Sequence, residues 1–341
     1  MKRNKQSLAS QGPGKKIVVI GGGTGTYTIL SGLKKYPELD LSVIVSMADS
    51  GGSNRVIRDE FGLLPTSDLR QCILALSSDN TDEILRKLFN YRFTHGTGIS
   101  GMTYGNLFMA ALTDILGSQK EAIEETSKIL SVRGNILPVT YENSNLVATY
   151  DNGVQVLGEH FIDEPSRKTI YHKITNLEIF PAVKANSDAL KAIREADLIV
   201  LGPGDLFTSV ICNIVVNGVA RAIKNSSAKK LFVMNIMTRF GQTDGYKASD
   251  HINEVEKYLG AGSLDYCLIN KNNISKEAVK WYKSHDAAQV EDDLGNKKGL
   301  KIIRRNVVSS KFFQKSKSDK LTRSFIRHDS DKLAKAVVDI I

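Results

Sequence analysis

Short apolar runs alternate with segments of helical periodicity along most of the chain. Residues 15–20 end in four apolar positions, IVVI, which is typical of a strand buried on both faces of a parallel sheet. A glycine-rich turn follows, and then a helical pattern that stops before Pro37. The order of strand, turn and helix returns from residue 186 onward. These repeated units predict an α/β fold with a doubly wound, mostly parallel, Rossmann-like sheet covered by helices on both faces.

The middle of the chain has a different pattern. Residues 136–175 consist of short alternating segments, and Asp151-Asn152-Gly153 is a strong turn signal. This region predicts a small β-hairpin insertion. Helical patterns precede it over residues 81–92 and 103–117, with a glycine-rich loop between them.

The C-terminal part adds three further expectations. Residues 206–223 have the pattern of one continuous helix, and residues 291–325 are predicted to form an irregular basic loop. The last residues predict an amphipathic helix with Asp329 or Ser330 as its N-cap. We expect residues 15–341 to form a single α/β nucleotide-binding domain, and residues 1–14 to be a disordered basic tail.

The net charge of +9 for 341 residues is concentrated in one segment. Residues 297–327 contain eleven Lys or Arg and one acid, Asp319, so the rest of the chain is nearly neutral. Few aromatic residues accompany these charges, which is a weak signal for nucleic acid. The segment is either a solvated loop or a patch that attracts phosphates or an acidic partner. We expect no specific nucleic-acid binding.

Membrane and secretory signals are not apparent. The sequence has no apolar run of eighteen residues, and its basic N-terminus leads into no separate apolar segment. Three cysteines, Cys72, Cys212 and Cys267, lie far apart in apolar surroundings, as buried thiols of a reducing compartment do. We therefore expect a cytoplasmic protein with no membrane partner.

Glycine-rich turns follow several of the predicted strands, and ligands of open α/β sheets bind at those strand ends. The first turn contains Gly22, Gly23, Thr24 and Gly25. Glycines let an anion approach the backbone closely, and the helix that follows offers free N–H groups and a positive dipole end. The turn matches neither the dinucleotide fingerprint nor a P-loop. It is either a phosphate site or a purely structural turn.

The second turn brings a carboxylate to the same edge. Asp49, Ser50, Gly51 and Gly52 follow the second strand, where dinucleotide enzymes often carry an acid. Asp68 follows in a nearby loop. Together Asp49 and Asp68 would suit Mg²⁺ shared with ligand phosphates, or they only cap turns.

Two later turns complete the set. Polar amides at strand ends can contact a base or a sugar. The candidate binding residues that these turns contribute to the same crevice are Gly202, Gly204, Asp205, Thr208 and Ser209 in the third turn, and Asn235 and Thr238 in the fourth.

Catalytic motifs are weak in this sequence. There is no GxSxG or HExxH, and the six histidines show no metal-ligand spacing. Hydrolase and acyl-transfer activities are therefore disfavoured.

Longer motifs then point to a family. VVIGGGTGT, ADSGGS, LLPTSDLRQC, YGNLFMAALTDI, LSVRGNILPVT, ADLIVLGPGDLFTSV, NIMT, GQTDGYKASDH and RHDSDKLAKAV occur in this order. Together they resemble the YvcK/CofD family, which contains gluconeogenesis factors and 2-phospho-L-lactate transferases. The resemblance runs from about Lys15 to the C-terminus, and its last two motifs favour the gluconeogenesis-factor (YvcK) branch.

The resemblance implies a regulatory protein that binds a nucleotide sugar, such as UDP-GlcNAc, and links carbon supply to cell-envelope synthesis and cell shape. It implies a protein partner in envelope-precursor synthesis, and we expect a homo-oligomer. It adds Asn106 to the ligand-binding candidates, Arg327 as a clamp for the diphosphate, and Tyr282 as a ring that stacks on the base. Arg327 as a solvated residue and Tyr282 as a core residue remain alternatives.

Departures from the family pattern affect the choice between branches. Where the family has ADDGGSSG, this chain has Ser50 in place of the second acid, and GHSLGN has become Gly101-Met102-Thr103-Tyr104-Gly105-Asn106. The missing acid weakens metal-assisted chemistry. The alternative function is nevertheless a Mg²⁺-dependent transferase that moves a phospho-hydroxyacid from a nucleotide diphosphate carrier to a deazaflavin. An NAD-dependent dehydrogenase is a third reading, disfavoured by the imperfect fingerprint.

Overall fold

The strands of the protein form one large and one small sheet. The computed structural model describes residues 14–79, 81–166, 168–313 and 324–341. Within these residues the strands are β1 (Lys15–Gly21), β2 (Leu39–Val45), β3 (Asn135–Pro138), β4 (Asn145–Tyr150), β5 (Gln155–Leu157), β6 (Ile174–Phe180), β7 (Leu198–Leu201), β8 (Lys229–Val233), β9 (Tyr266–Asn270) and β10 (Lys301–Arg305).

The large sheet has the order β10-β9-β8-β7-β1-β2-β3, and each pair of neighbours in it is parallel. Its centre is apolar, since Ile17, Val18, Val19 and Ile20 of β1 are at most 2% exposed. The small sheet is antiparallel, with the order β5-β4-β6. The predicted doubly wound, mostly parallel α/β fold is therefore confirmed.

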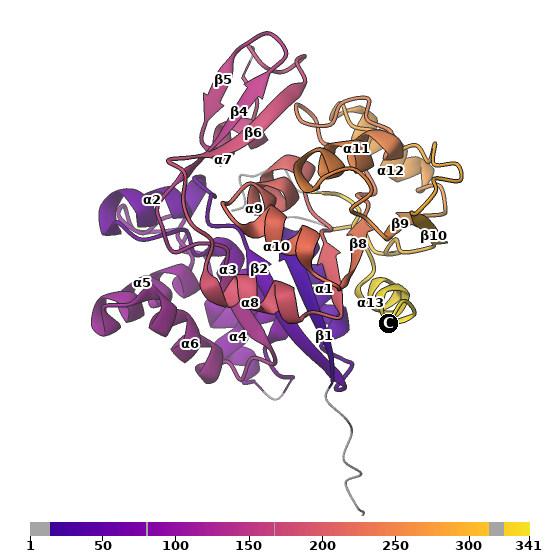
Figure 1. Cartoon of the computed structure of the whole chain (residues 1–341). Helices are drawn as coiled ribbons and strands as arrows, with labels where there is room; N and C mark the ends of the chain where they lie inside the picture. Colours follow the sequence, from indigo (N-terminus) through magenta and orange to yellow (C-terminus); the bar gives the residue numbers. More distant parts are fainter. Residues whose placement is uncertain (1–13, 80, 167, 314–323) are drawn as a thin grey trace, which may run out of the picture.

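Helices connect the strands and cover the large sheet (Figure 1). They are α1 (Gly23–Leu33), α2 (Gly52–Phe61), α3 (Ser67–Leu76), α4 (Glu83–Asn90), α5 (Tyr104–Leu116), α6 (Gln119–Ile129), α7 (Glu159–Asp163), α8 (Ser187–Glu195), the π-helix η1 (Leu206–Ile211), α9 (Cys212–Ile214), α10 (Val219–Asn225), α11 (Ala248–Leu259), α12 (Lys276–Lys283) and α13 (Ser330–Val338). None of the helices in the described segments combines the length and the apolar character that a membrane span requires.

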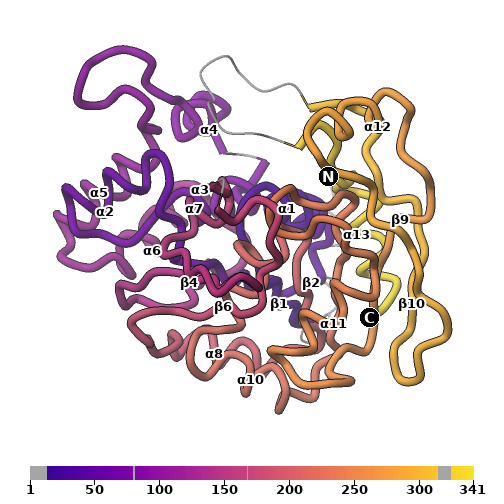
Figure 2. Tube along the Cα trace, turned by 90° about the horizontal axis from the view of Figure 1, so that it is seen from above, coloured from indigo at the N-terminus to yellow at the C-terminus, as the bar shows by residue number. Residues whose placement is uncertain are grey.

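Two groups of helices lie on opposite faces of the sheet. Helix α1 packs against α3 and α13, and α10 packs against α8 and α11. Figure 2 shows the first group on one side of β1 and β2 and the second group on the other. Asp329 caps α13 as predicted, because its side chain accepts hydrogen bonds from the backbone N–H groups of Asp331 and Lys332.

The region predicted as a hairpin insertion over residues 136–175 has other boundaries. Its first residues form β3, which pairs in parallel with β2 at the edge of the large sheet. The antiparallel part begins at Asn145 and ends at Phe180. Figure 1 shows this small sheet projecting from the body, with α7 at its base. The segment was misread because NILP is too short to reveal its partner strand.

Two other expectations are corrected. The predicted helix over residues 206–223 is instead η1, α9 and α10, interrupted before Gly218, whose φ is +102°. The predicted loop over residues 291–325 contains β10, an edge strand with half-buried Ile302 and Ile303. Residues 1–13 of the expected tail and residues 314–323 of the basic segment lie outside the described residues.

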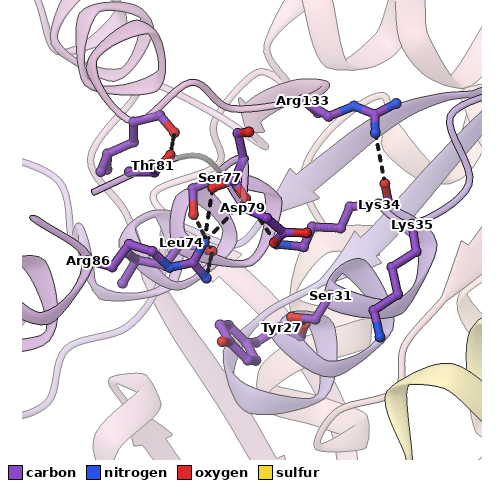
Figure 3. Close-up of polar contacts among 12 residues, drawn as sticks. Tyr27, Ser31, Lys34, Lys35, Leu74, Ser77, Asp79, Thr81, Arg86 and Arg133 are labelled. Carbon is purple, nitrogen blue, oxygen red and sulfur yellow. Dashed lines mark hydrogen bonds and ion pairs between the residues drawn. The ribbon is translucent and has the colours of Figure 1, made fainter. Parts of the chain in front are cut away.

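At the edge of the sheet where the strands begin, cations hold the ends of helices (Figure 3). Lys34 donates from Nζ to the Ser77 carbonyl oxygen at 3.0 Å and to Asp79 Oδ1 at 2.9 Å. Arg86 donates to the carbonyl oxygens of Leu74 and Ser77, at 3.4 Å each. These groups complete the last turn of α3, where carbonyls have no partner within the helix.

Candidate functional site

The opposite edge, where the strands end, contains a cavity of about 1270 Å³. Its walls include the residues that directly follow β1, β2, β7 and β8. The strand order reverses between β1 and β7, and this is the point at which open α/β sheets bind ligands.

The first and third glycine turns meet at this point. A Cβ atom on Gly25 would overlap the carbonyl oxygen of Pro203, so only glycine permits the contact between the turns. The N–H of Gly204 donates to Oδ1 of Asn235 at 3.2 Å, which ties the third turn to the end of β8. Gly23 has a φ of +63°, and a Cβ there would meet no atom within 4 Å. The turns therefore frame the cavity largely with backbone.

The second turn is held by a buried asparagine. Asp49 accepts from the Gly51 N–H at 2.9 Å through Oδ1 and from Asn54 Nδ2 at 2.5 Å through Oδ2. Asn54 in turn accepts from the N–H and the hydroxyl of Ser67 at the start of α3. Burial raises the pKa of Asp49, and these hydrogen bonds oppose that shift.

Helix α7 brings further carboxylates from the small sheet into the cavity. Glu159 and Asp163 line it beside Asp49. Burial raises the pKa of Glu159 well above its ordinary value, and the negative charges of Asp49 and Asp163 raise it further. The helix is anchored at its first turn, where the His160 N–H donates to Ser50 Oγ at 3.2 Å.

Arg239 contacts this acidic end of the cavity. Its Nη2 donates to Asp163 Oδ2 at 2.7 Å, and its Nε lies 4.0 Å from Asp205 Oδ2. Burial alone would lower the pKa of the guanidinium, but the charges of Asp205 and Asp163 leave it raised. Burial raises the pKa of Asp205, and Arg239 opposes that shift. Gln242 Nε2 donates to Asp163 Oδ1 at 3.0 Å.

Another part of the wall contains Trp281, whose ring stacks on His285 with 3.9 Å between centroids. The Trp281 ring also stacks on Phe325 at 5.3 Å, and Phe325 stacks on Phe312 at 4.6 Å, both outside the lining. Arg327 lies with its guanidinium carbon 3.4 Å from the centroid of the Phe313 ring. Tyr282 is only 6% exposed, and its hydroxyl accepts from the Ile326 N–H at 3.2 Å. Its ring therefore belongs to the local core, the structural alternative for this residue.

Most of the predicted site residues converge on the cavity. Those in its lining are Gly22, Gly23, Thr24, Gly25, Asp49, Gly51, Gly52, Asp68, Gly204, Asp205, Thr208, Ser209, Asn235, Thr238, Tyr282 and Arg327.

Three predicted residues lie behind the lining. Ser50 anchors α7 as described above. Asn106 is fully buried, donating to the hydroxyls of Ser53 and Ser67, each at 3.0 Å, and accepting from Arg70. Gly202 is buried, and its N–H donates to the Ile20 carbonyl oxygen.

The sequence prediction missed the acids of α7, Arg239 and Trp281. No local pattern marks Glu159 or Asp163, because α7 has five residues within a region that was read as hairpins. Arg239 directly follows Thr238 in the fourth turn, so its position at a strand end was an available signal.

The side chains proposed for Mg²⁺ are a limited donor set. Asp49 already accepts hydrogen bonds through both oxygens, and the Asp68 carboxylate lies beside Gly22. In the described part of the chain, no group of three or more His, Cys, Asp or Glu side chains is arranged to hold a metal ion. The Mg²⁺ site at Asp49 and Asp68 therefore stays a prediction, in which ligand phosphates would have to supply further oxygen ligands.

Comparisons with known proteins agree with this architecture. A family model described as 2-phospho-L-lactate transferase CofD matches residues 17–310. A putative gluconeogenesis factor of Aquifex aeolicus is 40% identical over 331 residues, which cover 95% of this chain and 96% of the relative. The gluconeogenesis factor of Bacillus subtilis is 35% identical over 328 residues, covering 96% of this chain and 98% of that protein. A crystal structure of a Bacillus halodurans protein is similar with a TM-score of 0.86 and 36% identity, covering 95% of this chain and 99% of the other.

Proposed function

The chain belongs to the family described as 2-phospho-L-lactate transferase CofD, together with proteins named gluconeogenesis factors, and on this premise we propose that it is a regulatory protein that binds a nucleotide sugar such as UDP-GlcNAc. In this proposal the bound form signals nucleotide-sugar supply in the cytoplasm to a protein partner in envelope-precursor synthesis. Carbon flow into the envelope, and with it cell shape, would follow that signal.

The contact between the first and third glycine turns is the observation that carries the proposal. The turns lie side by side at the switch between β1 and β7 and open into one cavity. Their backbone N–H groups and the N-terminal end of α1 favour an anion with two adjacent phosphate groups. Thr208 and Ser209 add hydroxyl groups to the same wall.

The two ends of the cavity suit the two ends of a nucleotide sugar. A base has an aromatic face, and Trp281, stacked with His285 and Phe325, brings aromatic surface to one wall of the cavity. A sugar has hydroxyl groups that donate hydrogen bonds. The carboxylates of Glu159, Asp163 and Asp205 can accept them. We therefore propose that the base lies at the aromatic wall and the sugar at the acidic end.

A matched pair of variants tests the proposal. Gly23→Val places a branched side chain in the cavity lining. Gly117→Val causes the same backbone strain, because the φ of Gly117 is +67°, but this residue lies at the end of α5 outside the lining. By titration calorimetry, Gly23→Val should lower the affinity for UDP-GlcNAc by about 2–4 kcal/mol, since each charge-assisted hydrogen bond contributes about 1.5–3 kcal/mol. Gly117→Val should bind like the wild type. Equal affinities of the two folded variants would contradict the proposal.

The cavity volume favours a second candidate function, the transferase. Small-molecule sites usually occupy about 300–1,000 Å³, so 1270 Å³ leaves room for an acceptor beside a nucleotide diphosphate carrier. Incubation with a guanosine diphosphate whose terminal phosphate is esterified to lactate, a deazaflavin alcohol and Mg²⁺, followed by mass spectrometry, tests this activity. The alcohol would attack the lactyl phosphate and break the diphosphate bridge, so release of GMP with formation of the phosphodiester product would favour the transferase over the purely regulatory role.

A further inference from the structure

We infer that Arg239, which lies beside Asp205 of the third glycine turn, supplies the positive charge that a diphosphate on these turns requires next to the acidic end of the cavity, so that nucleotide-sugar binding needs no divalent metal ion. The inference rests on the proposed function and concerns how the same site accepts its ligand. It assigns a binding role to a residue of the fourth turn, beside Thr238.

This end of the cavity contains several acidic side chains. Asp49, Glu159, Asp163 and Asp205 all line it, and their charges act on one another. The diphosphate of a nucleotide sugar carries two further negative charges. Two unit charges 4 Å apart interact by about 4 kcal/mol at an effective dielectric constant of 20. A diphosphate on the glycine turns beside this end is therefore stabilised by a cation close to it.

Arg239 is placed to be that cation. Its side-chain hydrogen bonds within the described residues all run from Nη2 to Asp163. Its Nε is shielded from solvent and lies 4.0 Å from Asp205 Oδ2, but has no hydrogen-bond partner among those residues. The side chain is 22% exposed and lines the cavity. Asp163 thus fixes the orientation of the guanidinium while donors remain for a phosphate oxygen, the geometry for which arginine is well suited.

The carboxylates of Asp49 and Asp163 already accept hydrogen bonds, and a metal ion would compete with the donors of those bonds. Both oxygens of Asp49 accept hydrogen bonds from the second turn and Asn54. Both oxygens of Asp163 accept from Arg239 and Gln242. A metal ion held here would have to displace these donors, whereas a phosphate that contacts Arg239 displaces none of them.

The test is a set of calorimetric titrations with UDP-GlcNAc in buffer with EDTA and in buffer with excess MgCl₂. The wild-type affinity should agree within about twofold between the two buffers. Arg239→Gln should lose at least tenfold in EDTA, and Arg239→Lys should lose less because it keeps the charge. Arg58→Gln is the matched control, since Arg58 hydrogen-bonds Asn143 and Asn145 outside the cavity. It should bind like the wild type.

A second variant separates binding from folding. Removal of Arg239 leaves Asp163 and Asp205 without their cation, which can destabilise the fold. The double variant Arg239→Gln/Asp163→Asn removes one negative charge together with the positive one. It should fold, as judged by circular dichroism, and should still bind at least tenfold more weakly in EDTA.

The outcomes are distinct. Wild-type binding that disappears in EDTA and returns with MgCl₂ overturns the inference and leaves the proposed function intact. Undiminished affinity of the folded double variant also overturns the inference alone. Absence of UDP-GlcNAc binding by the wild type in both buffers overturns the proposed function and the inference with it.

Discussion

The two edges of the large sheet use similar residue types in opposite ways. Where the strands begin, Lys34 and Arg86 donate to the last carbonyls of α3, and Arg133 donates to the carbonyl oxygen of Lys34. Where the strands end, Arg239 is held by Asp163 and Asp205, and its side chain lines a cavity.

The difference shows how to separate structural from binding charges in this fold. A cation beside a helix C-terminus completes hydrogen bonds that the helix cannot make itself. A cation held by carboxylates at a cavity wall stays available to another anion. Variants at the first edge should therefore change stability alone, and variants at the second should change binding or its dependence on conditions.

The largest effect is expected at the contact between the glycine turns. Gly25→Ala forces a methyl group into the carbonyl oxygen of Pro203. We expect at least a 100-fold loss of affinity for UDP-GlcNAc and a loss of about 3 kcal/mol in the free energy of unfolding, the upper range for overpacking. Urea unfolding and calorimetry measure the two quantities. Gly295→Ala is the control, because a Cβ there meets no atom within 4 Å. A Gly25→Ala protein as stable as this control would contradict the close contact.

The next largest effect is expected in the pH dependence of stability, through His328 in the cavity lining. Burial lowers the pKa of His328 to about 4, against an ordinary value of 6.5. The unfolded chain therefore takes up this proton at a higher pH than the folded chain, so stability is present above pH 6.5 and is lost as the pH falls toward 4. The loss should be about 2–3 kcal/mol. Urea unfolding between pH 7 and 4 should show it in the wild type, and His328→Asn should lack it. Identical pH profiles of the two proteins would refute this prediction.

A smaller effect is expected from Lys34 at the other edge. The Lys34 side chain is 10% exposed, so Lys34→Met keeps most of its apolar contacts and removes two charge-assisted hydrogen bonds. We expect the free energy of unfolding to fall by about 1–2 kcal/mol. Affinity for UDP-GlcNAc should stay within about twofold of the wild type, and a tenfold loss would break the distinction between the edges.

The smallest effect is expected from the partner of Lys34. Asp79 is 85% exposed, and the hydrogen bond from Lys34 lowers its pKa below the ordinary 3.8. The ion pair therefore contributes to the free energy of unfolding above the ordinary pKa of 3.8, and this contribution is lost as the pH falls further. Because exposed ion pairs contribute little, Asp79→Asn should change stability by less than about 0.5 kcal/mol at neutral pH. A change as large as that of Lys34→Met would show that the ion pair, and not the Ser77 carbonyl, is the main partner.

The parts of the fold that the sequence predicted are those with strong local patterns. IVVI in β1 is a continuous apolar run, and it forms the buried centre of the sheet. β10 escaped prediction because an edge strand buries one face only, and KIIRR among basic residues does not show this. The break before Gly218 escaped prediction because LFTSVICNIVV is mostly apolar, with Thr208, Ser209 and Asn213 as its polar residues, and such a run does not indicate where a helix ends.

The site was predictable where its residues directly follow strands, as at Gly23, Asp49 and Asn235. Residues from the small sheet and α12 were not, because their position depends on how distant segments pack. Tyr282 illustrates the limit, since its helical spacing fits both a cavity wall and a core. The structure places its ring in a buried cluster with Ile274 and Ile326, where it is 6% exposed and also borders the cavity.

The contact between β1 and β7 has a consequence for synthesis of the chain. β1 ends at Gly21, but its neighbour β7 starts at Leu198, and residues 324–328 close one side of the cavity. On the ribosome, the glycine turn after β1 therefore emerges long before the segments that complete its surroundings. A nascent chain that stops short of residue 324 has no finished binding site, so the ligand can stabilise only the last stage of folding. Any ligand of this cavity therefore acts on the finished protein and not on its assembly.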